Sequence, residues 1–146
     1  MKVVISLGGS LLTQNLSPEN FKKYAEVLKL IAKEHRLIVV CGGGTTARRY
    51  ISIARELSNN KTLSDKLGIL ATHMNALLLI SALGKDAYPV VLSKLEEIAQ
   101  AFYSNKILVC GGNEPGVSTD FDSALIAEFI QADLLINATN IDGVYE

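Results

Sequence analysis

Residues 3–10, with the sequence VVISLGGS, decide the fold, because a short apolar run passes directly into a glycine-rich turn. The same arrangement returns at residues 37–44, LIVVCGGG, and at residues 107–112, ILVCGG. Runs this short and this uniformly apolar are typical of strands buried on both faces of a parallel sheet. Glycine leaves backbone N–H groups bare, so such a turn at a strand end can close on an anion. The three turns predict a phosphate-rich ligand.

Helical patterns separate these strands. Residues 21–32 place apolar side chains at three- and four-residue spacing, after a helix start at Ser17 and Pro18. Thr45 or Thr46 can cap a helix ending near Leu57, and Asp120 can cap another near the end of the chain. A further helix runs from about residue 62 to 84 and is apolar enough to be largely buried. Shorter segments complete the pattern: a strand over residues 87–92, a helix over 95–102, and strands over 106–110 and 134–138.

Strands that alternate with helices predict an α/β fold, a three-layer αβα sandwich with a mostly parallel sheet. A chain of 146 residues with 49% hydrophobic content suffices for one domain, residues 1–146. In such sheets, ligands bind outside the carboxyl ends of the strands, where the glycine turns fall. We therefore expect the site at that edge.

Composition excludes several classes of partner. The formal net charge is -1, so no general positive field favours nucleic acid or an anionic membrane. We expect no apolar stretch of the roughly 18 residues that cross a bilayer, and no signal-peptide pattern opens the chain. We expect a cytoplasmic protein. Cys41 and Cys110 each end an apolar run, which indicates small buried side chains rather than metal ligands or a disulfide.

Two common nucleotide motifs fit poorly. Gly42, Gly44 and Ala47 match the G-x-G-x-x-A dinucleotide pattern, with Asp65 farther on. A dinucleotide fold needs that acid at the end of a second strand, but residues 59–66 are polar and open a helix. No G-x-x-x-x-G-K-[ST] string occurs. Arg48, one helical turn after the second glycine turn, can reach back to a phosphate; its alternative is an ordinary solvated helix residue.

Four segments match, in order and at similar separations, the signatures of the amino acid kinase superfamily: residues 4–11, 40–44, 119–120 and 139–145. Within it, residues 42–50 (GGGTTARRY), Asp65, residues 87–91 (AYPVV) and residues 111–116 (GGNEPG) resemble archaeal-type UMP kinases. Much of the superfamily has a lysine at the position of Ser6. Archaeal-type UMP kinases are similar to this chain in lacking it.

The resemblance implies an activity: transfer of the γ-phosphate of ATP to UMP, giving UDP, in pyrimidine nucleotide biosynthesis. It implies Mg²⁺ bound through the nucleotide phosphates, no metal site of the protein itself, and a homo-oligomer, specifically a hexamer. The family's chains are longer, so we expect this domain to be truncated before a C-terminal ATP-binding portion. Whether the piece is a fragment or a natural truncation stays open.

The resemblance also implies roles for individual residues. Those expected to act on the transferring phosphoryl group are Gly8, Gly9, Ser10 and Asp120. Those expected to bind UMP are Gly43, Asp65, Asn113, Glu114, Pro115, Gly116, Val117, Ser118 and Thr119. Those expected to bind ATP are Gly9, Ser10, Gly44, Arg48, Thr139, Asn140 and Tyr145.

Simpler interpretations remain for some of these residues. Asp65 can be an ordinary first-turn helix acid, residues 113–119 a plain surface loop, and Asp120 only a helix cap. His73 has apolar neighbours in the sequence, and we expect a packed or interface histidine.

Two other functions stay open beside UMP kinase. One is a kinase of another small phosphate acceptor such as isopentenyl phosphate. Such enzymes usually keep the first-turn lysine and a histidine after the second turn, where this chain has Thr45, Thr46 and Ala47. The other is a nucleotide-binding module without turnover.

Overall fold

The computed structural model describes residues 1–114 and 117–139. Its elements follow in the order β1 (Lys2–Leu7), α1 (Gly9–Thr13), α2 (Pro18–Ala32), β2 (Arg36–Cys41), α3 (Gly44–Leu57), α4 (Lys61–Leu83), η1 (Gly84–Asp86), α5 (Leu95–Ala101), η2 (Phe102–Ser104), β3 (Leu108–Cys110), α6 (Thr119–Ile130) and β4 (Leu134–Ala138). The four strands lie in the order β3-β2-β1-β4, and every neighbouring pair is parallel.

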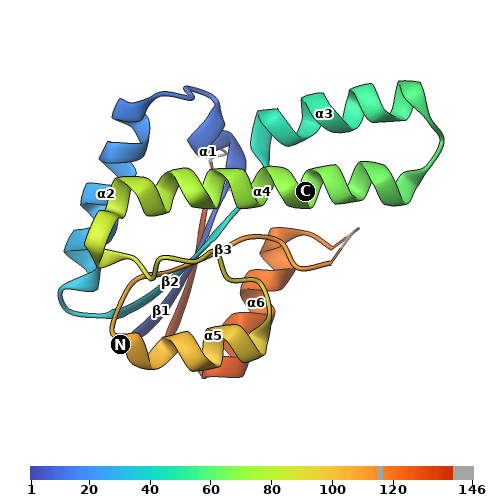
Figure 1. Ribbon diagram of the computed structural model, residues 1–146. Helices are drawn as coiled ribbons and strands as arrows, with labels where there is room; N and C mark the ends of the chain where they lie inside the picture. The colour runs from blue at the N-terminus through green and yellow to red at the C-terminus, as the bar shows by residue number, and fades with distance from the viewer. Residues whose placement is uncertain (115–116, 140–146) are drawn as a thin grey trace, which may run out of the picture.

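Helices cover both faces of the sheet, as the three-layer prediction requires (Figure 1). Val3, Ile5 and Leu7 of β1 face the core beneath α2 and α4. Val4, between them, faces the second core, where Ile98 of α5 and other side chains of α5 and α6 pack. Successive side chains of a strand point to opposite faces, so an apolar strand supplies both cores.

Two glycine turns pack directly against each other. We call residues 8–10 the first turn, residues 42–44 the second turn and residues 111–112 the third turn. A Cβ on Gly42 would lie 2.6 Å from the Gly9 nitrogen, and one on Gly9 would collide with the Gly44 nitrogen. Gly44 also has a positive φ of 63°. Glycine is therefore needed at these three positions for turn-to-turn packing.

The short helix α1 was not predicted from the sequence. It carries Thr13, whose hydroxyl donates to Gly9 O at 2.9 Å and accepts from the N–H of Thr45 at 2.9 Å. Thr13 thus joins the first turn to the start of α3. Thr13 and Thr45 are 32 positions apart in the sequence, so no local sequence pattern indicates this contact.

Three local predictions were wrong. Helix α3 begins at Gly44, after Gly43, and neither Thr45 nor Thr46 caps it. Helix α6 is capped by Ser118, whose hydroxyl accepts from the N–H of Phe121 at 3.1 Å, and Asp120 lies inside the first turn. Residues 87–92 form only two isolated bridges to the β3 segment, because Pro89 at their centre has no N–H to donate to a strand ladder.

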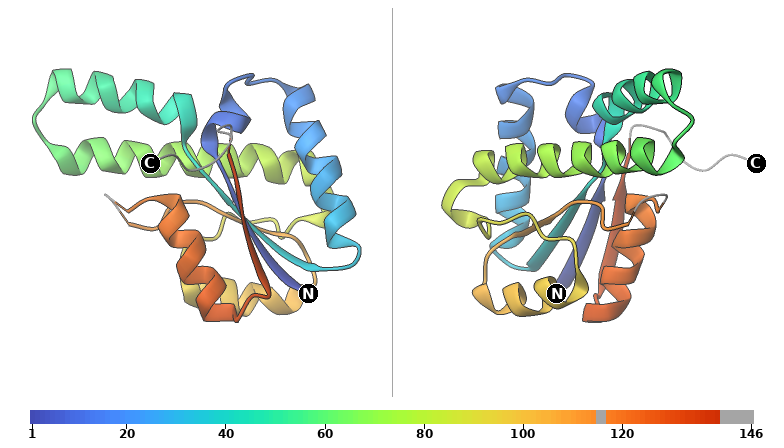
Figure 2. Two further views of the ribbon diagram at one scale, coloured as in Figure 1. Left: turned by 180° about the vertical axis from the view of Figure 1, so that it is seen from behind. Right: turned by 45° about the vertical axis from the view of Figure 1, so that its right-hand side comes forward.

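Helix α4 is less buried than expected. One side packs into the core through Ala76, Leu79 and Leu83, but the opposite side exposes leucines and a methionine. Among the described residues, the stretch Lys61–Asp86 is, by length and composition, long and apolar enough to cross a membrane, so the expectation that no stretch reaches that length was wrong. Figure 2 shows that α3 and α4 run side by side and project beyond the sheet as an arm.

Both cysteines are buried and unpaired, as predicted. Burial raises the pKa of the Cys41 thiol to about 12 and raises that of Cys110 as well. Both thiols therefore stay protonated and unreactive at neutral pH.

We predict that Gly42→Ala destabilises the fold by about 2 kcal/mol, because its Cβ meets backbone that cannot turn away. The matched variant is Gly68→Ala in α4, whose Cβ would lie 3.2 Å from the flexible end of Ile51. It should be neutral or stabilising, by up to about 1 kcal/mol, because alanine favours a helix. Urea denaturation measures both, and equal stability of Gly42→Ala and wild type would contradict the packing argument.

Candidate functional site

A cleft of about 420 Å³ lies at the carboxyl edge of the sheet, between the α3–α4 arm and the loop that precedes α6. The residues that line it are Gly43, Gly44, Ala47, Arg48, Ile51, Asp65, Gly68, Ile69, Thr72, Gly112, Val117, Ser118 and Thr119. The second and third turns both contribute, so the cleft is where the sequence predicts a phosphate-rich ligand.

Seven of the predicted site residues meet in this cleft. From the predicted UMP set these are Gly43, Asp65, Val117, Ser118 and Thr119, and from the ATP set Gly44 and Arg48. They come from three separate segments of the chain. The fold therefore brings residues that are distant in the sequence into one cleft.

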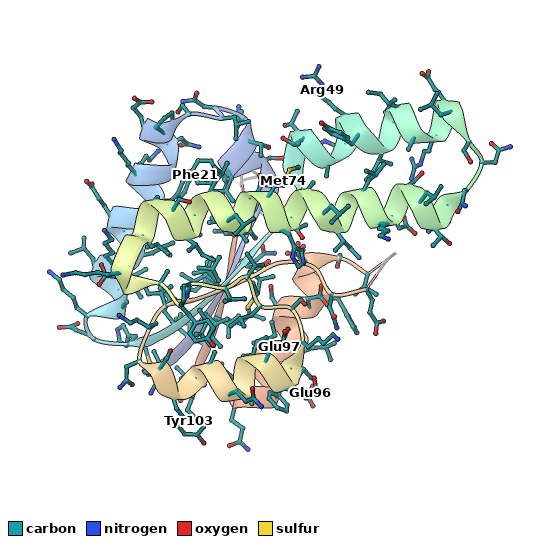
Figure 3. The ribbon with its side chains drawn as sticks, in the orientation of Figure 1. Phe21, Arg49, Met74, Glu96, Glu97 and Tyr103 are labelled. Atoms are coloured by element: carbon teal, nitrogen blue, oxygen red, sulfur yellow. The ribbon has the colours of Figure 1, made fainter. Side chains whose placement is uncertain are left out.

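The first turn lies beside the cleft and is joined to it by Arg48. The guanidinium of Arg48 donates from Nη2 to the Ser10 hydroxyl at 3.1 Å. The prediction that Arg48 reaches back to a phosphate stays a prediction, and this bond places its guanidinium beside the first turn. The next residue, Arg49, points away from the body of the protein (Figure 3) and is exposed.

Asp120 and Thr139 lie around the first turn. The hydroxyl of Ser6, at the end of β1, donates to Asp120 Oδ1 at 2.8 Å. The N–H of Gly8 donates to Ala138 O at 2.9 Å, which brings the following residue, Thr139, beside the turn. A Cβ on Gly8 would lie 3.7 Å from the Thr139 Cα.

Other predicted residues do not join the cleft. Asn113 and Glu114 are exposed and are not among its lining residues. The N–H of Asn113 instead points to Asp122 Oδ2, at 3.4 Å. Pro115, Gly116, Asn140 and Tyr145 lie outside the described residues.

The predicted site included Asp65 of α4 but not three other residues of that helix. Gly68, Ile69 and Thr72 line the cleft together with Asp65. Residues three, four and seven positions apart share one face of a helix, so this spacing was a usable signal. Asp65 itself accepts from Lys61 Nζ at 2.9 Å, one turn earlier on α4.

His73 packs against the third turn, as the sequence predicts for a packed histidine. Its Nε2 lies 2.9 Å from Gly112 O. A carbonyl oxygen can only accept, so Nε2 carries the proton of this bond.

Asp122 sits beneath the cleft loop in a mostly buried position. Burial raises its pKa above the ordinary value, and the negative charge of Glu114 adds to this, while the N–H of Asn113 opposes it. Ionisation of Asp122 therefore costs more free energy in the folded protein than in the unfolded chain.

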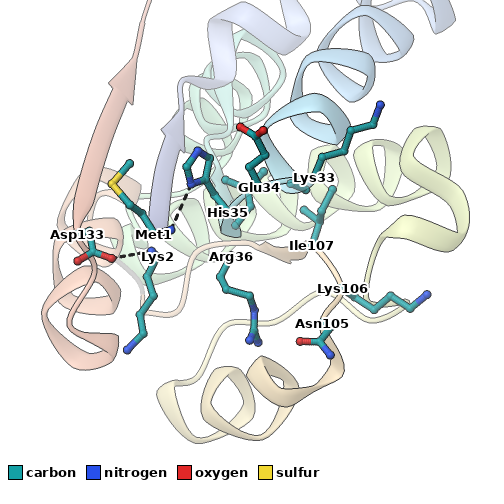
Figure 4. Close-up of a pocket in the computed structure, with 12 residues that line it drawn as sticks. Met1, Lys2, Lys33, Glu34, His35, Arg36, Asn105, Lys106, Ile107 and Asp133 are labelled. Atoms are coloured by element: carbon teal, nitrogen blue, oxygen red, sulfur yellow. Dashed lines mark hydrogen bonds between the residues drawn. The ribbon is translucent and has the colours of Figure 1, made fainter.

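A larger cavity, about 560 Å³, lies at the opposite edge, beside the amino ends of β1 and β2. It is lined by several cationic residues, among them Lys2, Lys33 and Lys106. In Figure 4 these three side chains point in different directions. Lys2 and Lys106 donate to the carbonyls of Ile130 and Lys85. Two of its three lysines are therefore already bonded to backbone carbonyls.

Comparison with known sequences decides the family, since residues 1–146 match the amino acid kinase family along their whole length. The chain belongs to the amino acid kinase family. It is 50% identical over 145 residues to a uridylate kinase of Methanosarcina mazei, with 99% of this chain and 62% of that protein covered. It is 52% identical over 149 residues to a uridylate kinase of Methanococcus maripaludis, with 100% and 66% covered.

A solved structure shows the same fold. The crystal structure of uridylate kinase from Archaeoglobus fulgidus matches with a TM-score of 0.93 and 45% identity, over 100% of this chain and 66% of that one. This confirms the predicted amino acid kinase fold. The chain spans about 62% of the length of the Methanosarcina relative.

We predict that Asp122→Asn stabilises the protein at pH 7. Folding raises the pKa of this carboxyl group, so the wild-type protein loses folding stability as the pH rises through the folded-state pKa. Asparagine cannot ionise, so the variant is more stable than wild type wherever Asp122 is ionised. The gain should shrink as the pH falls and vanish below about pH 3, where Asp122 is protonated in both the folded and the unfolded state. Thermal unfolding from acid to neutral pH measures it, with Glu128→Gln on the exposed side of α6 as control. A gain that persists unchanged in acid would contradict this reading.

Proposed function

We propose that this chain carries out, or forms the acceptor-binding part of, UMP kinase activity: ATP and UMP react to ADP and UDP, in pyrimidine nucleotide biosynthesis. The observation that carries the proposal is the carboxyl-edge cleft, in which Gly43, Asp65 and residues 117–119 meet. The relatives named uridylate kinases, about 50% identical, support the same substrate.

The chemistry needs position and charge rather than a general base. The acceptor oxygen of a nucleoside monophosphate is largely ionised at neutral pH, so holding the two phosphates in line supplies most of the rate. Gly8, Gly9 and Ser10 would cradle the transferring phosphoryl group, with the N–H groups of Gly9 and Ser10 as donors, because the N–H of Gly8 is bonded to Ala138 O. Arg48, already bonded to Ser10, would add positive charge there.

The two nucleotides divide the site. Gly43 would face the UMP phosphate, Asp65 would accept from ribose hydroxyls, and residues 113–119 would surround the uracil. ATP would use Gly9, Ser10, Gly44, Arg48 and Thr139, together with Asn140 and Tyr145. Mg²⁺ would enter with ATP and neutralise part of the negative charge on the phosphates. Asp120, held by Ser6, would orient cationic groups around the phosphates.

Calorimetry and a coupled ADP assay test the proposal. UMP-dependent ADP formation supports the kinase, and CMP in parallel tests the base. ADP formation that depends on isopentenyl phosphate instead would favour the other acceptor, and UMP binding without turnover would favour a binding module. A protein that neither binds nor phosphorylates UMP would exclude the proposed function.

Two substitutions test how the site is divided. Asp65→Asn should weaken UMP binding about tenfold and leave ATP binding nearly unchanged, because it removes a charged acceptor from the ribose site. Arg48→Ala should weaken ATP more than UMP, by a similar factor. Titration of each variant with each nucleotide gives the comparison. Equal losses for both ligands would contradict the division.

We also propose a cytoplasmic homo-oligomer, built on the exposed side of α4. Leu63, Leu70 and Leu77 repeat every seven residues and are 52%, 49% and 52% exposed. Met74 lies on the same side and is 47% exposed. Seven-residue apolar spacing is the pattern of helix-to-helix pairing. Residues 67–83 carry no Asp, Glu, Lys or Arg, so two copies of this side meet without charge repulsion.

Leu70→Glu should therefore separate the oligomer, because it places a charge in an apolar seam. Light scattering coupled to size exclusion measures the mass, and Leu30→Glu, on the exposed side of α2, serves as control. A monomeric wild type, or an unchanged mass in Leu70→Glu, would contradict the interface. Flotation with lipid vesicles separates this from membrane binding, the other use of an exposed apolar helix.

A further inference from the structure

Helix α4 holds two of the glycine turns through buried polar side chains that the proposed chemistry does not use. Asn75 Nδ2 donates to Gly42 O at 2.8 Å and to Gly43 O at 3.2 Å, so it binds the second turn. Thr72 and His73 both bond Gly112, in the third turn. One helix therefore sets where two walls of the cleft stand relative to each other.

Thr72 touches both turns. Its hydroxyl accepts from the N–H of Gly112 at 2.8 Å. Its methyl group, Cγ2, is 3.6 Å from the position a Cβ would take on Gly43. Thr72 is buried, with 6% of its surface exposed, and it lines the cleft between the two turns.

The hydroxyl of Thr72 has no proton left for a ligand. Its single O–H is donated to Ile69 O at 2.6 Å. A threonine hydroxyl has one donor, so the side chain serves the protein rather than the phosphate or the base. Thr72 therefore lines the cleft without donating a hydrogen bond to a ligand, and its role there must be a different one.

His73 holds the third turn through a second hydrogen bond, to the carbonyl of Gly112. Its Nε2 donates to Gly112 O at 2.9 Å, so both the N–H and the carbonyl of Gly112 are bonded to α4. A Cβ on Gly111 would lie 2.5 Å from the His73 ring, so glycine is what permits this approach.

We propose that Thr72 is a positioning residue that fixes the third turn against the second, and so sets the distance between the phosphate site and the base site. This rests on the proposed function, in which Gly43 faces the acceptor phosphate and the loop after Gly112 surrounds the uracil. UMP bridges the two turns. Inorganic phosphate contacts only the second.

Comparing UMP with inorganic phosphate therefore distinguishes a positioning role of Thr72 from a general effect on stability, which would weaken binding of both ligands. Thr72→Val keeps the shape and the methyl group but leaves the buried N–H of Gly112 without its acceptor. We expect UMP binding to weaken about tenfold, since an unmet buried donor loosens the third turn. Phosphate binding should change less than twofold. Thr72→Ser keeps the hydroxyl and should restore UMP binding.

The experiment is calorimetry of the 146-residue chain with UMP and with inorganic phosphate, for wild type, Thr72→Val and Thr72→Ser. Ser81→Ala is the matched control, because the Ser81 hydroxyl also donates to a carbonyl of α4, that of Leu77, at an exposed position. His73→Leu removes the second bond to Gly112 and should act in the same direction as Thr72→Val. Hydrogen exchange at the Gly112 amide gives a readout without any ligand, and it should accelerate at least tenfold in Thr72→Val.

The outcomes are distinguishable. Selective loss of UMP affinity, rescue by Thr72→Ser and faster exchange at Gly112 support the proposal. Equal loss of UMP and phosphate binding, or unchanged exchange at Gly112, would overturn it. A wild-type chain that binds no UMP would refute the proposed function and, with it, the role of Thr72 in UMP recognition. The exchange rate would then still report whether Thr72 holds the turn.

Discussion

The contact between the backbones of the first and second glycine turns is the constraint on which the site depends. Gly9 lies so close to Gly42 and Gly44 that none of the three positions has room for a side chain. Close packing transmits any added volume as strain. The contact brings the carboxyl ends of β1 and β2 together with the first residues of α3, and Thr13 fastens the same junction. This packing fixes how the backbones of the two turns lie relative to each other.

Helix α4 works on three sides at once. Its apolar side closes the core with Leu79 and Leu83, its polar residues bond the second and third turns, and its exposed leucines face away from both. This explains why its composition resembles a membrane-spanning helix while Asp65 and Asn75 interrupt it. Asp65 lines the cleft and Asn75 bonds the second turn. The exposed leucines of α4 account for much of its remaining apolar composition.

Much of this was readable from the sequence. Apolar runs followed by glycines predicted parallel strands with a site at their carboxyl ends, and the helix patterns predicted α2 and α4 within a residue or two. Contacts between distant segments were not readable. Thr72 and Gly112 are 40 positions apart, and no local periodicity links them. Ser118 rather than Asp120 caps α6. The carboxylate of Asp120 accepts a hydrogen bond from Ser6, which is 114 positions away in the sequence.

The proposed nucleotide site is the carboxyl-edge cleft between the second and third turns. The most direct measurement is a titration of the isotopically labelled chain with UMP, followed through the backbone amide resonances. We predict saturable shifts at Gly43, Gly44, Gly112 and Ser118, with none around Arg36 and Asn105, which line the cavity at the opposite edge. Shifts confined to that opposite edge, or no saturable shift at the glycine turns, would contradict the account.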